Sequence, residues 1–468
     1  MKKTLIIILI IVAVVCGVSY AYIKLDMHIP FIDNYAQNFS DNLFNLKLKL
    51  EMKKLEREEE LLKQSENAQS PEGEVISEEI NEENVSEQTP PQEKIEENKP
   101  EEKKENVAQP GKNDIKEHKE VKISKTQKKD EEGNLIEVLT RKLVQTCHPI
   151  PVSYAASARY ARFDTGIVFV SENQMSLYDK KGEVRWNSAT NISDPVLKTN
   201  GDYALLWETD GQNAVVYKNR KQIYSIQSEN KIITGYISAV GECVLVTQKP
   251  YYKGEVIVFN KSGEIIYSRS FGSENIMAAA ISDTRRLAVA LMSVDTEANS
   301  KVAFFDINKT DEDCNIIYKD TIIYDMEFNS NSLIAYADGK MMSIRPNAKE
   351  DWVYNYGEKI LNRYMRGSRD TRMLMFDNQN NAELSVISLN GRETHKISTE
   401  VIADFGDIYN GYIIYNSERN LYLAQLDGTL LAKYVASRDI KKAYFIDDDN
   451  ILVVYNTSFE FLHIERNN

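Results

Sequence analysis

The chain has 468 residues, of which 42% are hydrophobic and 27% are charged, and its formal net charge is −14. This negative charge argues against nucleic acid as a partner, because contacts with phosphates require a basic surface. The four cysteines, at positions 16, 147, 243 and 314, form neither a CxxC pair nor a dense framework, so neither a structural zinc site nor a disulfide scaffold is indicated.

Residues 1–23 are predicted to be a transmembrane anchor. Two lysines precede an apolar stretch over residues 5–23, which at about 1.5 Å per residue spans the roughly 30 Å core of a bilayer. A cleaved signal peptide is the alternative, because residues 19–21 resemble a small-x-small cleavage site, but a signal peptide has a shorter apolar core. We favour a retained single-pass anchor. The two lysines then keep the N-terminus in the cytoplasm and place the rest of the chain outside the cell membrane.

Residues 24–66 form a membrane-proximal segment whose second half is rich in helix formers. Leu48, Leu55 and Leu62 repeat every seven residues, as in a coiled coil, but the companion column of the repeat holds Glu51 and Glu58. A solvated helix without a partner is therefore the interpretation that we favour for this part of the chain.

Residues 67–133 are predicted to be a disordered acidic linker. The segment has no aromatic residue, and residues 71–120 hold 16 Asp or Glu against 7 Lys, so this stretch alone contributes −9. Such a composition buries too little apolar surface to offset the entropy lost on ordering the chain. We expect a spacer that holds the following domain away from the membrane.

Residues 134–468 are predicted to be an all-β domain made of repeats. Short β-prone runs are separated by Gly, Asn, Asp and Ser turns. One run in each group ends on an aromatic residue or a histidine, and these residues are spaced 36 to 51 positions apart: Trp186, Tyr224, Tyr267, Tyr318, Tyr354, His395 and Tyr434. A period near forty residues with several strands per period is typical of propeller blades.

The runs form seven groups of four and a last group of three. Because propellers close when one terminus completes the blade begun by the other, we expect residues 134–145 to supply the missing strand. The prediction is thus an eight-bladed β-propeller. Seven blades is the alternative, if one run has been divided too finely.

One stretch, residues 177–190, carries the repeat most clearly. Asp179 and Gly182 form a tight turn between two strands, and Trp186 follows four residues after the glycine. A weaker copy places Gly263 and Tyr267 in the same relation. We interpret these five residues as structural residues that dock one blade onto the next.

The pattern Asp179-x-x-Gly182-x-x-x-Trp186 resembles the repeat of quinoprotein-like propellers, of the PQQ-like or WD40-like kind, in which an aromatic residue docks neighbouring blades. The architecture also resembles an uncharacterised family of single-pass, membrane-anchored propeller proteins of Gram-positive bacteria. The resemblance implies a propeller fold. Quinoprotein enzymes hold a quinone cofactor and calcium, and some have a vicinal disulfide, but this chain has no Cys-Cys pair and no cofactor residue is carried over.

No catalytic, metal-binding or cofactor-binding residue is predicted. The sequence has no HExxH, no GxSxG and no Gly-rich phosphate loop, and its five histidines lie far apart. Asp179, Asp306 and Asp427 fall in predicted turns, where aspartate stabilises the backbone. Two carboxylates in the central channel would make a glycosidase if they lay about 5–10 Å apart, a distance that a sequence does not give.

Function is expected on the loops. The longest predicted loops are residues 248–255, 293–301 and 308–314, and the first carries Tyr251, Tyr252 and Lys253, an aromatic and basic tip that suits contact with a partner. An ordinary hairpin is the alternative for this tip. We predict a membrane-anchored extracytoplasmic propeller that acts as a non-catalytic protein-binding or scaffolding module of the cell envelope. The alternative is an extracellular enzyme, or a sensor of a small ligand or glycan, with its site at the mouth of the channel.

Overall fold

The structure is a computed structural model that describes residues 106–107, 121–129, 135–137, 139–152, 155, 157–172, 174–294, 298–367, 371–378 and 380–466. The predicted anchor (1–23) and membrane-proximal segment (24–66) lie outside the described residues, as does most of the predicted linker. No helix capable of spanning a bilayer occurs among the residues that are described.

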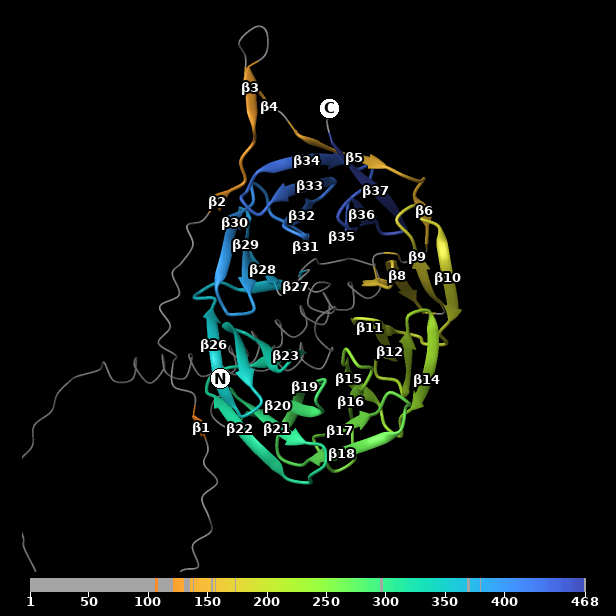
Figure 1. Cartoon of the computed structure of the whole chain (residues 1–468), viewed down its shortest axis with the longest axis vertical. Coiled ribbons are helices and arrows are strands. Elements are labelled where there is room, and N and C mark those ends of the chain that lie inside the picture. The colour runs from red at the N-terminus through yellow and green to blue at the C-terminus, as the bar shows by residue number, and fades with distance from the viewer. Residues whose placement is uncertain are drawn as a thin grey trace, which may run out of the picture.

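Eight four-stranded antiparallel units follow one another around a ring (Figure 1). We number these blades 1 to 8 in chain order. In each blade the strands are named from the inside outward. Blade 1 contains β7 (Arg159–Phe163), β8 (Gly166–Ser171), β9 (Gln174–Tyr178) and β10 (Val184–Ala189), and blade 2 contains β11 (Pro195–Asn200), β12 (Tyr203–Glu208), β13 (Asn213–Lys218) and β14 (Lys221–Gln227). Blade 3 contains β15 (Ile232–Ile237), β16 (Cys243–Thr247), β17 (Gly254–Phe259) and β18 (Ile265–Phe271), and blade 4 contains β19 (Asn275–Ile281), β20 (Arg286–Val294), β21 (Ala298–Asp306) and β22 (Glu312–Tyr318).

Blades 5 to 8 repeat this order. Blade 5 contains β23 (Ile323–Asn329), β24 (Ser332–Ala337), β25 (Lys340–Arg345) and β26 (Lys349–Asn355), and blade 6 contains β27 (Leu361–Arg366), β28 (Thr371–Asp377), β29 (Ala382–Ser388) and β30 (Glu393–Ser398). Blade 7 contains β31 (Phe405–Tyr409), β32 (Tyr412–Ser417), β33 (Asn420–Gln425) and β34 (Leu430–Val435), and blade 8 contains β35 (Lys442–Asp447), β36 (Asn450–Val454), β37 (Ser458–Arg466) and β5 (Arg141–Gln145). The predicted all-β, eight-bladed propeller is thus confirmed, and the seven-bladed alternative is wrong.

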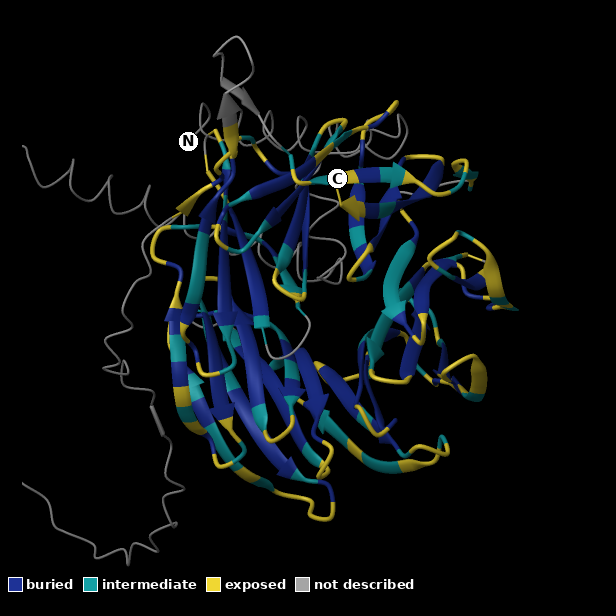
Figure 2. Cartoon of the chain, turned by 45° about the horizontal axis from the view of Figure 1, so that its top comes forward, coloured by how far each residue is buried: buried dark blue, intermediate teal, exposed yellow. Residues whose placement is uncertain are grey.

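The core lies between the blades. The second strand of a blade is packed on both faces, so it reads as a nearly continuous apolar run: β8 is GIVFVS and β12 is YALLWE, and in each the first five residues are buried. The outer strand β10, by contrast, alternates exposed and half-buried residues. Figure 2 shows the same distribution, with buried residues along the strands and exposed residues mainly in the turns.

The ring is closed by the N-terminal side of the domain, as the strand count predicts. β5 pairs antiparallel with β37, with Leu143 opposite Ile464, and the side-chain amide of Gln145 donates a hydrogen bond of 2.8 Å to Glu460. The closing strand is shorter than the predicted range 134–145. Its first part forms β4 (Leu135–Glu137), which pairs instead with β3 (Gln127–Lys129) in a hairpin that projects beyond the ring (Figure 1).

A second, unpredicted pairing lies on the outer rim. β2 (Val121–Lys122) runs parallel to the end of β30 in blade 6, and Ser124 then bridges to Thr429 in blade 7. We call residues 121–124 the strap. Further upstream, β1 (Asn106–Val107) lies parallel to β22 in blade 4. The strap lies within the range predicted to be disordered, so for these residues the structure differs from the prediction.

The strap is held by one apolar residue as well as by backbone hydrogen bonds. Ile123 is buried in the cluster between blades 6 and 7, and its amide donates to the carbonyl of Ser398 at 3.1 Å. A single buried side chain within a charged stretch leaves no periodic pattern. This explains why composition alone indicates a disordered segment here.

The predicted loop at residues 293–301 is also not a loop over most of its length. β20 and β21 are nine residues each and leave only residues 295–297 between them. The ladder continues to the pair of Val294 and Ala298, where polar residues remain compatible with strand pairing because one face is solvated.

Candidate functional site

The eight inner strands surround the centre of the ring, and they divide it into an apolar side and a charged side. β15 (IITGYI) and β19 (NIMAAAI) carry no charged residue. The inner strands of the other six blades each carry at least one charged residue, although an inner strand packed in a core is normally apolar. The charged side is therefore the place in the ring where we look for a binding or catalytic site.

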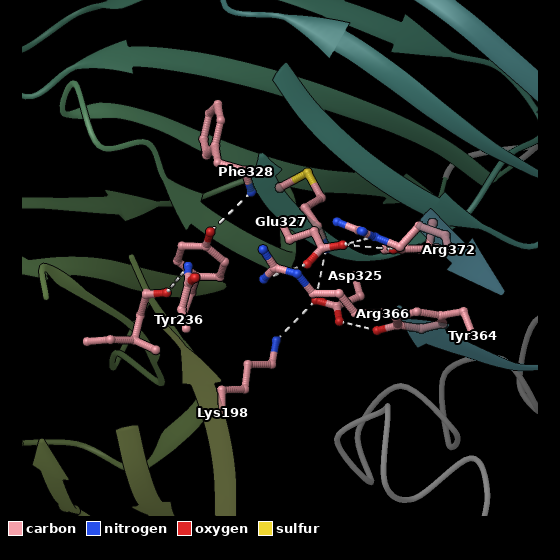
Figure 3. A network of polar contacts seen from close by, with 12 residues as sticks. Lys198, Tyr236, Asp325, Glu327, Phe328, Tyr364, Arg366 and Arg372 are labelled. Atoms are coloured by element: carbon pink, nitrogen blue, oxygen red, sulfur yellow. Dashed lines mark hydrogen bonds and ion pairs between the residues drawn. The ribbon is translucent and has the colours of Figure 1, made fainter. Parts of the chain in front are cut away.

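Blades 2, 5 and 6 meet at one carboxylate. The ammonium group of Lys198 on β11 lies 3.1 Å from Asp325 on β23, and the hydroxyl of Tyr364 on β27 donates a short hydrogen bond to the other oxygen of Asp325 (Figure 3). Tyr364 stacks on Tyr336 with ring centroids 3.9 Å apart. Asp325 is thereby fixed by a charge, a hydroxyl and a packed aromatic pair.

Two residues further along β23, Glu327 accepts hydrogen bonds from two groups and forms an ion pair with a third. Arg372 donates at 2.6 Å and the hydroxyl of Tyr336 at 2.9 Å, while the guanidinium of Arg366 lies 3.5 Å away (Figure 3). Burial acts to raise the pKa of Glu327, but the charges of Arg372 and Arg366 and the hydrogen bonds outweigh it and hold the pKa below its ordinary value. Glu327 is therefore an anion at neutral pH.

A third carboxylate lies in blade 7. Asp407 is fully buried and accepts hydrogen bonds from Arg162 of blade 1 at 2.7 Å and from the amides of Phe445 and Ile408 at 2.8 and 2.9 Å. Burial raises the pKa of Asp407, against the opposing effects of Arg162 and the two amides. A second hydrogen bond of Arg162, at 3.1 Å, ends on the carbonyl of Arg366 in blade 6.

These pairings decide what the inner strands can do chemically. Each of their four carboxylates lies within 4 Å of a cation, since Asp447 also approaches Lys180 at 3.9 Å. General acid and base work on a glycoside needs one carboxyl that is free to give or take a proton. Among the described residues, no group of three or more His, Cys, Asp or Glu side chains is placed to hold a metal ion.

The predicted contact residues lie on the connection between β16 and β17. Tyr251 is fully exposed, Tyr252 is half exposed, and the amide of Tyr252 donates to the carbonyl of Lys249 at 3.1 Å, which closes a tight turn. Tyr251 has φ +66°, a conformation that is rare for a bulky side chain. Lys253 is exposed, and its amide donates to the carbonyl of Phe271 at 2.7 Å, which anchors the base of the turn.

More exposed apolar residues lie on the same face of the ring. Because successive strands of a blade are antiparallel, the connections after second strands and after fourth strands all open on one face, which we call the loop face. It carries Tyr251 and Tyr252, Ile360 and Ile402 between blades, and Val435 at the end of β34, all of them exposed. The opposite face carries Val184, Val240 and Ile265. The loop face therefore has more of the exposed apolar side chains, which can mark an interaction surface.

The predicted structural residues lie at contacts between blades or in the turns beside them. Trp186 packs edge-on against Tyr217 of the next blade at 5.5 Å, and Tyr267 lies 6.4 Å from Phe305 of blade 4. Asp179 accepts from the amides of Lys181 and Glu183 at 2.9 and 3.0 Å and so shapes the turn that contains Gly182.

The glycines of these turns lie against aromatic rings of the preceding blade. A Cβ atom on Gly263 would come within 2.8 Å of Tyr224, one on Gly391 within 2.5 Å of Trp352, and one on Gly182 within 3.0 Å of Phe461. Trp352 also donates from its ring nitrogen to the carbonyl of Leu389 at 2.8 Å. Two features therefore favour glycine at each of these positions: its φ is positive, and a Cβ atom would come too close to the neighbouring ring.

A cleft of about 750 Å³ lies between blades 7 and 8. Its apolar wall comes from Leu423, Leu431 and Ile464, and its polar rim includes Arg141 and His463. Sequence reasoning did not identify this cleft, because it depends on how β5 and β34 lie side by side.

The charged residues of the inner strands were also missed. A signal was present: Arg162, Lys198, Asp325 and Asp407 interrupt β-prone runs that open a repeat, where the equivalent strands of blades 3 and 4 are apolar. Which of these charges pair across the ring depends on the closure of the propeller.

Comparison with known proteins supports the fold. The crystal structure of the C-terminal WD40 domain of Sif2 is similar over 70% of this chain and 99% of its own, with a TM-score of 0.50 and 11% identity. BamB from Moraxella catarrhalis is similar over 69% and 99%, with a TM-score of 0.46 and 10% identity. The computationally designed protein Ika8 covers 70% and 100%, with a TM-score of 0.47 and 11% identity. The similarity to the Sif2 domain shows the β-propeller fold alone.

Sequence comparison gives a family but no characterised relative. No curated protein matches the chain. The profile described as "Family of unknown function (DUF5711)" matches residues 142–464, from the closing strand β5 to the end of β37.

Proposed function

This chain belongs to the DUF5711 family, whose function is unknown, and we propose that its propeller is a non-catalytic protein-binding module of the cell envelope. In this proposal the apolar residues 5–23 anchor the chain in the membrane as a single span. The acidic segment that follows holds the ring outside the cytoplasm. Its partner is a protein of the envelope.

One observation carries the binding proposal. Tyr251 is fully exposed on a tight turn and adopts a positive φ that glycine or asparagine would adopt at lower cost. The backbone strain of a bulky residue in this region is of the order of 1 kcal/mol or more. Strain of this kind that is kept at an exposed aromatic side chain is best explained by contact with another molecule, since tyrosine is enriched in interface hot spots.

The rest of the loop face supports this interpretation. Ile360, Ile402 and Val435 are also exposed on this face. The pairing of Asp325, Glu327 and Asp407 with cations, in turn, favours a role without acid and base chemistry.

The proposal is tested with the full-length protein in intact cells. A photo-crosslinking amino acid replaces Tyr251, and in a matched control it replaces Ile265, which is exposed in the same blade but follows a connection on the opposite face. We expect one envelope protein to be crosslinked reproducibly from position 251 and not from position 265. Equal crosslinking from both positions, or none from position 251, would contradict the proposal.

A second measurement separates binding from folding. Substituting both Tyr251→Ser and Tyr252→Ser removes two exposed rings, so the Tm of the protein should not fall. Under the proposal, crosslinking from a probe at Ile360 on the same face decreases in this variant.

A second candidate function is an enzyme, or a sensor of a small ligand or glycan, with its site in the channel. The charged side of the inner wall favours it, because positive groups there outnumber the carboxylates.

A further inference from the structure

The centre of the ring holds an excess of positive charge. In the ion pairs described above, three carboxylates, Asp325, Glu327 and Asp407, lie next to four cations: Lys198, Arg162, Arg366 and Arg372. The excess is one positive charge, in a chain whose formal net charge is −14. The surplus matters most for Arg372, whose side chain is buried, because charges withdrawn from water are normally paired.

The surplus is concentrated at Glu327. This single carboxylate serves two arginines: Arg372 donates to one oxygen at 2.6 Å, and Arg366 lies 3.5 Å from the other, beyond a good hydrogen bond. Among the described residues the guanidinium of Arg366 has no other ionic or hydrogen-bonding partner. A guanidinium has five N–H donors, so most of the donors of Arg366 remain available.

Buried Arg372 provides an independent observation. Its side chain is only 2% exposed, yet its Nη2 atom has no hydrogen-bond partner in the part of the chain that the structure describes. Leaving a donor of a buried charged group unsatisfied destabilises the folded state. Figure 3 shows the guanidinium groups of Arg372 and Arg366 on either side of Glu327.

Water reaches this position from the centre of the ring. The side chain of Arg366 is 45% exposed and that of Lys198 is 32% exposed, although both come from inner strands. Arg162 approaches only the main chain of Arg366, where its Nη2 donates to the carbonyl at 3.1 Å. Two partly exposed cations, Lys198 and Arg366, thus lie in one contact network with the buried donor of Arg372 (Figure 3).

We propose that this region binds a small oxyanion, a phosphate or carboxylate group, through the guanidinium groups of Arg366 and Arg372. Planar guanidinium donors match the oxygens of both groups in pairs. Lys198 and Arg162 add favourable potential without leaving their own carboxylates. The site is separate from the loop-face turn at Tyr251, and this inference goes beyond the protein-binding function proposed above.

The test uses the full chain purified in detergent, titrated calorimetrically with inorganic phosphate and, separately, with acetate, at an ionic strength held constant with sodium chloride. We expect saturable binding of at least one anion and a rise in Tm that follows its concentration. Binding of phosphate alone assigns a phosphate group, and binding of acetate alone assigns a carboxylate. Absence of binding by both anions overturns the proposal.

Two variants and a control locate the site. Arg366→Gln removes the most exposed guanidinium while leaving Glu327 paired with Arg372, and we expect affinity to fall at least tenfold. Arg366→Lys keeps the charge, hence the fold, but loses the planar pair of donors, so affinity also falls. The control Arg345→Gln changes an exposed arginine on β25 that pairs with Asp351, and it should leave affinity unchanged.

The outcomes are distinguishable from those of the binding proposal. Undiminished affinity in both Arg366 variants overturns the site. Crosslinking from position 251 should be the same in wild type and in Arg366→Gln, so the two proposals fail independently.

Discussion

Lys198 on β11 lies 3.1 Å from Asp325 on β23, so an ion pair joins blade 2 to blade 5 across the centre of the ring (Figure 3). These two blades share no strand pairing. The contact therefore constrains the distance between blades 2 and 5, which the hydrogen bonds within each blade do not determine.

The first prediction concerns this pair. A double-mutant cycle with Lys198→Met and Asp325→Asn should give a coupling free energy of about 1 kcal/mol, because both side chains are partly exposed. The coupling should decrease in about 1 M salt, where the Debye length is only ~3 Å. Urea unfolding of the four proteins measures it, and a coupling of zero at low salt would show that the pair does not hold the blades together.

The second prediction concerns glycines at positive φ. Gly391 and Gly411 have φ +76° and +87°, but a Cβ atom on Gly391 would come within 2.5 Å of Trp352, whereas one on Gly411 would meet no atom within 4 Å. Gly411→Ala should lower the free energy of unfolding by about 1 kcal/mol through backbone strain. Gly391→Ala should lower it by a further 1–3 kcal/mol, roughly, through overpacking. Equal losses in urea unfolding would mean that the ring of Trp352 moves aside freely.

The third prediction concerns pH. The pKa of Glu327 is lowered in the folded state, so its stabilising contribution is complete above the unfolded value of about 4.3 and is lost as pH falls through the folded pKa. The difference in free energy of unfolding between wild type and Glu327→Gln should therefore be largest near neutral pH and shrink below about pH 4.

For Asp407 we expect the opposite dependence of the free energy of unfolding on pH. Because its pKa is raised in the folded state, the folded protein binds a proton more readily than the unfolded chain. The free energy of unfolding of wild type relative to Asp407→Asn should rise as pH falls from the folded pKa toward the unfolded value of about 3.9. Unfolding curves between pH 7 and pH 3 test both residues, and parallel slopes for the two variants would contradict the assignment.

The fourth prediction concerns the strap. Ile123→Ala removes the one buried side chain of residues 121–124, so amide hydrogen exchange at Ile123 should speed up by about 30-fold or more, as expected for a loss of at least ~2 kcal/mol. Exchange in β28 should not change. Lys122→Ala, an exposed neighbour, is the matched control. Equal acceleration in β28 would show that strap and ring open together.

Much of the fold could be predicted from the sequence because each blade repeats a local pattern. The turn at Asp179 and Gly182, followed by Trp186, marks a strand pair and a blade contact within ten residues. Apolar runs such as GIVFVS reveal strands buried on both faces. The missing last strand also required a closing strand near residue 140, and β5 fills that place.

The remaining features depend on contacts between distant residues. The strap depends on a rim that exists only after blades 6 and 7 have packed, and its one apolar residue does not stand out among charged neighbours. The candidate anion site likewise joins blades 1, 2, 5 and 6. In the sequence each of its arginines is an ordinary residue of a β-prone run. The site can be recognised only once it is known which blades face each other.

The closing strand also has a consequence for synthesis. Gln145 and Glu460, which are hydrogen-bonded to each other, are 315 positions apart. At 5–20 residues per second, a ribosome needs roughly 15–60 s to make the chain between them. Throughout that interval β5 is complete but its partner β37 does not exist, so blade 8 cannot close until β37 has been made. A chain that ends anywhere before Ser458 keeps an open sheet edge, and such an edge is available to the wrong partner.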